Sequence, residues 1–153
     1  MKKLFFIFVF FSLPLFFISC GEDDKILSED EFFIAFEGTN ATLPKSSEDT
    51  LKIPVYIAAE SGGSVTVNIG TDTDSTTAVI GTDYEFVRGP QLVYPIGAGY
   101  DSLMIISNTG GTPGDLILEL FLESNSAGYN MGFFYGENAD STSHDRFRVN
   151  ITE

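Results

Sequence analysis

The feature that most constrains the fold is an alternation of apolar and polar residues that recurs along the chain after residue 31. Side chains on a strand point to opposite faces in turn, so each alternating run presents one apolar face. No segment shows a sustained helical period. The long alternating runs are residues 51–58, 65–69, 116–123 and 146–152, and the shorter strand candidates are residues 32–37, 91–94 and 100–106. The chain is therefore predicted to be all-β, with about seven strands.

Turn residues separate these runs. Gly62-Gly63, Gly89-Pro90 and Pro113-Gly114 stand between successive runs, where a chain must reverse its direction. Seven one-faced strands with frequent turns predict an antiparallel β-sandwich, in which two sheets hide their apolar sides against each other. Pro54 does not fit an interior strand, because proline has no N–H to donate to a neighbour. Its strand is expected to be an edge at that point or to carry a bulge.

The first 19 residues predict a lipoprotein export signal that is removed. Lys2 and Lys3 precede an apolar run over residues 4–18, and Phe17-Ile18-Ser19-Cys20 has the form of a lipobox. The run is too short for a comfortable membrane-spanning helix of ~20 residues. Cys20 is the only cysteine of the chain, and diacylation of its thiol explains it. Residues 20–31 are then a lipidated acidic tether, and residues 32–153 form one domain.

The net charge of the mature chain restricts the classes of partner that it can bind. Two of the eight basic residues leave with the signal while all 22 acids remain, so the balance is 6 − 22 = −16. Nucleic-acid binding needs Lys and Arg to displace counterions, so no nucleic acid is expected as a partner. Membrane attachment is expected through the lipid anchor alone.

The tether also bears on the location of the protein. Its acids directly after the cysteine resemble those of Bacteroidetes surface lipoproteins, whereas the alternative interpretation is a solvated spacer. The resemblance implies a protein anchored in the outer membrane and exposed at the cell surface.

Residues 77–84, Thr-Ala-Val-Ile-Gly-Thr-Asp-Tyr, are similar to the T-A-x-x-G-x-D-Y signature of Calx-beta domains. Residues 92–97 follow at family-like spacing and resemble its L-x-F-x-x-G segment. Three later strands match residues 103–106, 118–122 and 147–152. The resemblance covers residues 32–153 and implies a seven-stranded, immunoglobulin-like sandwich.

The same resemblance raises the question of calcium. Family members that bind Ca²⁺ hold it at one end of the sandwich with carboxylates from several loops, because the ion takes 6–8 oxygen ligands. Carried over by position, the acids here are Glu48, Asp83, Asp115 and Glu153. The family's other acidic runs are missing, so the site is expected to be degenerate and no cofactor is expected. Asp83 is expected to bond local backbone N–H groups instead.

One segment stands out as a candidate contact surface. Residues 129–135 carry four aromatic rings, Tyr129, Phe133, Phe134 and Tyr135. Two interpretations remain open. The rings either pack on the core beside the last strand, or form an exposed platform for a sugar or a protein partner.

Catalytic signals are weak. His144 lies among Ser and Asp residues in a polar segment, where solvent exposure is expected, whereas a catalytic triad needs a pocket formed by the fold. No zinc-like Cys/His set occurs. We therefore expect no enzyme and no catalytic residues. The expected function is a non-catalytic surface lipoprotein for extracellular interaction, adhesion or accessory glycan binding. The alternatives are a calcium-stabilised structural module and a small extracytoplasmic hydrolase.

Overall fold

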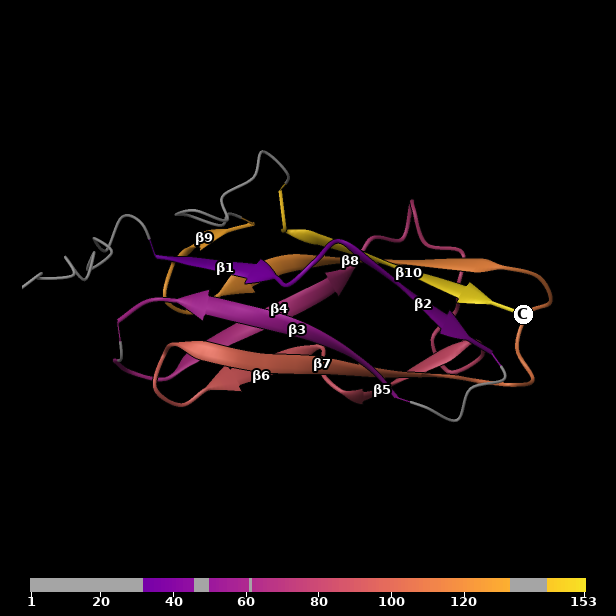
Figure 1. Ribbon diagram of the computed structural model, residues 1–153, viewed down its shortest axis with the longest axis horizontal. Helices are drawn as coiled ribbons and strands as arrows, with labels where there is room; N and C mark the ends of the chain where they lie inside the picture. The colour runs from indigo at the N-terminus through magenta and orange to yellow at the C-terminus, as the bar shows by residue number, and fades with distance from the viewer. Residues whose placement is uncertain (1–31, 46–49, 61, 133–142) are drawn as a thin grey trace, which may run out of the picture.

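The computed structural model describes residues 32–45, 50–60, 62–132 and 143–153. Their strands form two five-stranded sheets, which run roughly along the long axis of the molecule (Figure 1). The first sheet has the order β5-β7-β3-β1-β9 and the second sheet has the order β2-β10-β8-β4-β6. The bounds are β1 Phe33–Phe36, β2 Asn40–Pro44, β3 Leu51–Ala58, β4 Val65–Thr71, β5 Tyr84–Arg88, β6 Gln91–Tyr94, β7 Gly99–Ser107, β8 Leu116–Asn125, β9 Asn130–Met131 and β10 Arg146–Thr152. Within these residues no helix is long and apolar enough to cross a membrane.

All seven predicted runs are strands, and the all-β sandwich is confirmed. The strand number is corrected from seven to ten in the described residues, because β2, β5 and β9 were not predicted. Each of the three lacks a sustained apolar face. β2 buries only Leu43, β5 buries only Tyr84, and β9 has two residues. These three segments are strands because they form hydrogen bonds with a neighbouring strand, and their own sequences carry no sustained alternating apolar pattern.

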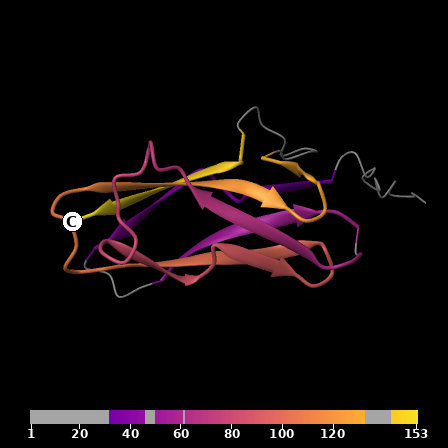
Figure 2. The same cartoon turned by 180° about the vertical axis from the view of Figure 1, so that it is seen from behind.

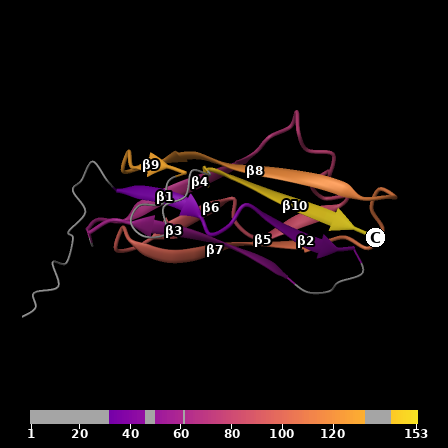
Figure 3. The same ribbon diagram turned by 45° about the horizontal axis from the view of Figure 1, so that its top comes forward.

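The sandwich is not purely antiparallel, which is a second correction. β1 pairs in parallel with β9, and β2 pairs in parallel with β10 (Figure 3). The chain switches sheets between β1 and β2, where Gly38 has a φ of 105°, a backbone conformation that glycine adopts without strain. This switch places β2 along β10 and so brings residues 40–45 beside the C-terminal strand.

Pro54 lies in β3, the middle strand of the first sheet, so its strand is not an edge. However, β1 ends at Phe36, which pairs with Val55. The Pro54 carbonyl accepts a hydrogen bond from the Glu37 N–H at 3.0 Å, and its nitrogen points to the same side, just beyond the end of β1. The missing donor therefore faces a position where no strand continues.

The core lies between the two sheets and is built from the alternating positions of the strands. Its fully buried side chains come from both sheets: Ile34, Phe36, Ile53, Val55, Ile57, Val67, Leu92, Leu103, Ile105, Leu118, Leu120, Val149 and Ile151. Tyr94 brings a hydroxyl group into this layer, and the hydroxyl donates to the Val55 carbonyl at 2.8 Å across the two sheets. Burial of this continuous apolar layer is the main stabilising contribution.

The loops gather at the two ends of the sandwich. At the end that carries the C-terminus, β2, β7 and β10 finish and β5 and β8 begin (Figure 2). We call this region the loop end, and it comprises Lys45, residues 79–83, residues 108–115 and Glu153. The opposite end carries the start of β1.

Candidate functional site

The loop end brings together three of the four acids that the Calx-beta resemblance points to. Asp83 accepts a hydrogen bond from Thr112, Glu153 accepts one from Gly114, and Asp115 accepts one from the Glu153 N–H at 3.2 Å. The fourth acid, Glu48, lies outside the described residues. The resemblance therefore located the acids at one end of the fold.

Asp83 is fully buried, with 0 % of its surface exposed. Its Oδ2 accepts the Val79 N–H at 2.7 Å and its Oδ1 accepts the Thr112 N–H at 2.6 Å. Burial alone would raise the pKa of Asp83, but these hydrogen bonds and the charge of Lys45 outweigh it, so its pKa lies below the ordinary value. Asp83 thus binds local backbone N–H groups, and it joins the segment before β5 to the loop between β7 and β8.

Gly111 makes the close approach of that loop to Asp83 feasible. A Cβ at this position would lie 2.5 Å from Asp83 Oδ1 and 2.9 Å from the Thr82 carbonyl. Both distances are shorter than the contacts that Cβ atoms make in proteins. A side chain at residue 111 would therefore push the loop between β7 and β8 away from the Asp83 carboxylate. Gly111 thus has a specific packing role beyond turn formation.

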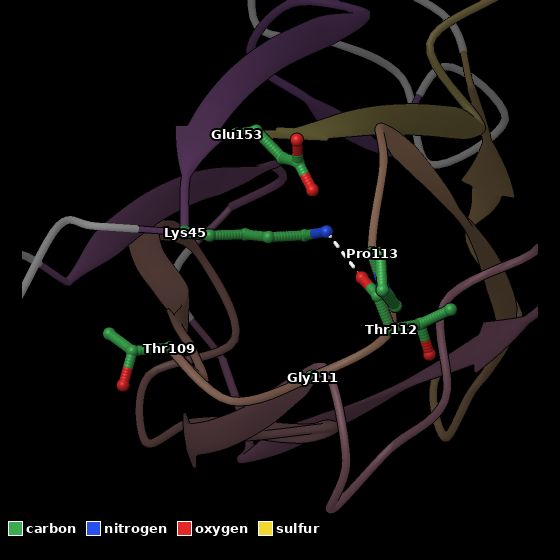
Figure 4. A pocket seen from close by; sticks show the side chains of 6 residues that line it. All are labelled: Lys45, Thr109, Gly111, Thr112, Pro113 and Glu153. Carbon is green, nitrogen blue, oxygen red and sulfur yellow. Dashed lines mark hydrogen bonds between the residues drawn. The ribbon is translucent and has the colours of Figure 1, made fainter.

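Lys45 completes the loop end. Its Nζ donates to the Thr112 carbonyl at 2.5 Å (Figure 4). It also donates to the Gly114 carbonyl. Glu153 Oε1 accepts the Gly114 N–H at 2.5 Å. A hollow of about 470 Å³ opens beside these groups, and its lining consists of Lys45, Thr109, Gly111, Thr112, Pro113 and Glu153.

These residues do not fit a calcium ion. Both oxygens of Asp83 accept backbone N–H groups, and two of the nearby carbonyls already accept from the Lys45 ammonium. Across the described part of the chain, no group of three or more His, Cys, Asp or Glu side chains is arranged to hold a metal ion. Ca²⁺ needs 6–8 oxygen ligands, so a cation here would have to displace existing hydrogen bonds and a positive charge.

A second candidate site lies on the outer face of the first sheet. Tyr56 on β3 pairs directly with Tyr100 on β7, and their ring centroids are 4.4 Å apart at an interplanar angle of 31°. Tyr56 packs against Phe33, Ala35 and Ala58, a small cluster separate from the core between the sheets. Tyr100 is 64 % exposed. We call these two residues the outer tyrosine pair. Tyr56 occupies a polar-side position of the alternating run 51–58, whereas residues 100–106 do not alternate and so give no such signal for Tyr100.

Tyr129 was predicted as part of an aromatic contact surface, and the structure places it at the edge of the core. Its ring contacts Phe32 edge-on with centroids 5.5 Å apart, and the Asn125 side chain bonds its backbone N–H and carbonyl. Tyr129 is partly buried against the core cluster. The other three rings, Phe133, Phe134 and Tyr135, lie outside the described residues, as does Cys20. Their roles stay predictions.

The histidine and the two buried acids of the described residues each make a structural contact. His144 is half-buried rather than solvent-exposed, with Nδ1 3.1 Å from the Phe36 carbonyl, so it links the start of β10 to β1. Among the described acids only Asp83 and Glu119 are buried. Asp83 holds backbone groups, and Glu119 pairs with Arg148 Nε at 2.9 Å.

Comparison with known proteins identifies solved structures with a similar fold. No family model and no curated protein matches the chain. A solved structure of the apo-form Calx CBD1 domain has a TM-score of 0.57 and 20 % identity, with 79 % of this chain and 96 % of that domain covered. A structure of CBD12 from CALX1.2 gives 0.56 and 20 %, covering 78 % of this chain and 43 % of that one. A Bacteroides ovatus protein of unknown function gives 0.54 and 11 %, covering 80 % and 52 %. The chain therefore has a Calx-beta-like fold.

Proposed function

We propose that this Calx-beta-like sandwich is a lipid-anchored, non-catalytic module that makes contacts at the outer surface of a bacterial cell. The fold supports a structural or interaction role, and the predicted signal ending at Cys20 supports the anchor. The outer tyrosine pair is the observation that carries the contact function. It stacks two rings against each other on the outer face of the first sheet, away from the core between the sheets.

A carbohydrate is the partner that this surface favours. The exposed ring of Tyr100 offers an apolar face with a hydroxyl at its edge, which suits the C–H face and hydroxyls of a sugar ring. The mature charge of −16 repels acidic partners, so a neutral glycan suits the surface better than a sulfated or uronic one. The pairing Tyr56–Tyr100 fixes the two rings relative to each other, so little side-chain entropy remains to be lost on binding.

The test is binding of the full-length chain, purified in detergent, to an array of neutral and acidic glycans and to surfaces coated with matrix proteins. Tyr100→Ser and Tyr56→Ser are compared with Val93→Ser, which removes an apolar side chain that is 47 % exposed on β6 of the other sheet. We expect binding to neutral glycans that falls at least ~10-fold in the tyrosine variants, equivalent to ~1.4 kcal/mol, and is unchanged in the control. Tyrosine-dependent binding to a matrix protein alone would contradict the glycan assignment. Binding that no tyrosine variant alters would contradict the contact surface.

The anchor is tested separately. Cys20→Ser removes the thiol that the lipid needs, so the protein should move from the membrane fraction to the soluble fraction. Protease added to intact cells should digest the wild-type sandwich. A protein that withstands this treatment while a surface control is degraded would contradict exposure at the cell surface.

A further inference from the structure

We propose that the Lys45 ammonium is the built-in cation of the loop end, and that it holds the carbonyl oxygens of the loop between β7 and β8 in place of a bound calcium ion. This proposal does not depend on the contact function. It rests on the hydrogen bonds that converge on residues 112 and 114 from three separate parts of the chain.

The position of Lys45 follows from strand register. β2 pairs in parallel with β10 so that Pro44 lies beside Thr152, and the Lys45 N–H donates to the Thr152 carbonyl at 2.8 Å. This pairing places Lys45 one step past the end of β2, next to Glu153 at the end of β10. The side chain then reaches across the hollow to the loop between β7 and β8 (Figure 4).

That loop is held through both polar groups of two backbone units. The Thr112 N–H donates to Asp83 while the Thr112 carbonyl accepts from Lys45. The Gly114 N–H donates to Glu153 while the Gly114 carbonyl accepts from Lys45. Two carboxylates therefore take the donors, and one ammonium takes the acceptors.

The charges at the loop end agree with this arrangement. Asp83, Asp115 and Glu153 all lie there, and a positive charge nearby offsets the repulsion between their carboxylates. Lys45 supplies it, and its charge helps to lower the pKa of Asp83. A divalent ion would have to compete with a tethered ammonium for the same oxygens, at the cost of placing two positive centres side by side. The loop end of the wild-type protein should therefore keep its hydrogen bonds without calcium.

Lys45→Met tests the proposal, because it keeps the unbranched apolar part of the side chain and removes the ammonium group. Lys52→Met is the matched control, since Lys52 is an exposed lysine on β3 and its loss changes the net charge equally. Both are made in the full-length chain in detergent and melted with EDTA or with millimolar calcium. We expect Lys45→Met alone to melt several degrees lower in EDTA. Amide exchange at Thr112 and Gly114 should be roughly 10-fold faster, equivalent to ~1.4 kcal/mol.

Calcium gives the decisive comparison. It should raise the melting temperature of Lys45→Met more than that of the wild type, because the freed carbonyl oxygens and Glu153 can then take a divalent ion. Equal responses to calcium would overturn the proposal, as would Lys45→Met melting like the control. A second measurement needs no variant. Calcium should leave the amide signals of Thr112 and Gly114 unmoved in the wild type, and a shift at both would overturn the proposal.

Discussion

Replacing Asp83 with alanine removes the acceptor of two buried backbone N–H groups, those of Val79 and Thr112. Leaving a buried donor without its partner costs about 1–3 kcal/mol, and more when the lost acceptor is charged. Because Asp83 is fully buried, solvent in the folded protein gives little compensation. We therefore expect Asp83→Ala to lower the free energy of unfolding by roughly 3–4 kcal/mol, or ~10 °C in melting temperature.

Urea unfolding followed by circular dichroism measures this loss. Asp74→Ala is the matched control, because Asp74 is an exposed residue of the loop after β4, and surface changes of this kind usually stay within about 0.5 kcal/mol. If Asp83→Ala and Asp74→Ala unfold within 1 kcal/mol of each other, on the scale of a single net hydrogen bond, the carboxylate does not hold the loops together.

The pH dependence of the same contribution has a definite sign. The folded-state pKa of Asp83 lies below that of the unfolded chain, so the folded protein favours the charged carboxylate. Its stabilising contribution is fully present above the unfolded pKa of about 4 and is lost as the pH falls through the folded pKa. Asp83→Asn should therefore differ most from the wild type near neutral pH, and the difference should shrink below pH ~4. A difference that stays constant down to the acid limit would contradict the assignment.

Three further changes have expected magnitudes. Tyr94→Phe removes the buried hydroxyl bond to the Val55 carbonyl and should cost about 1 kcal/mol in urea unfolding, so a neutral result would contradict the bond. Gly111→Ala places a Cβ 2.9 Å from the Thr82 carbonyl and should cost about 1–3 kcal/mol, whereas unchanged melting would show that the loop yields freely. Arg88→Met breaks the ion pair with Asp101 and should cost less than about 1 kcal/mol, because Arg88 is half-exposed; a larger loss would mean that the pair is structural.

The strands that could be predicted are those with enough alternating residues to show a face. β3 and β8 are such strands, since alternate apolar residues, such as Ile53 and Val55 on β3 and Leu118 and Leu120 on β8, are buried between the sheets. β2 and β9 could not be predicted, because hydrogen bonds to β10 and β1 define them and their own residues bury little. Parallel pairing was missed for the same reason, since pairing between segments distant in the chain leaves no local pattern.

The candidate sites divide in a similar way. A motif located Asp83 at one end of the fold, and its turn chemistry indicated backbone hydrogen bonds. Lys45 could not be predicted, because its role depends on the register of β2 against β10 and on a loop 67 residues later. The outer tyrosine pair depends on the register of β3 against β7, although the alternation of residues 51–58 already indicated the polar side of β3.

The most direct test of the contact function is to locate where a bound glycan touches the sandwich. The neutral glycan that the array identifies is titrated into the full-length chain while amide and tyrosine ring signals are recorded by NMR. If the outer tyrosine pair is the contact surface, we expect the largest shifts on Tyr56, Tyr100 and their neighbours on β3 and β7. Shifts centred on residues 129–135 or on the loop end, with the outer tyrosine pair unmoved, would contradict it.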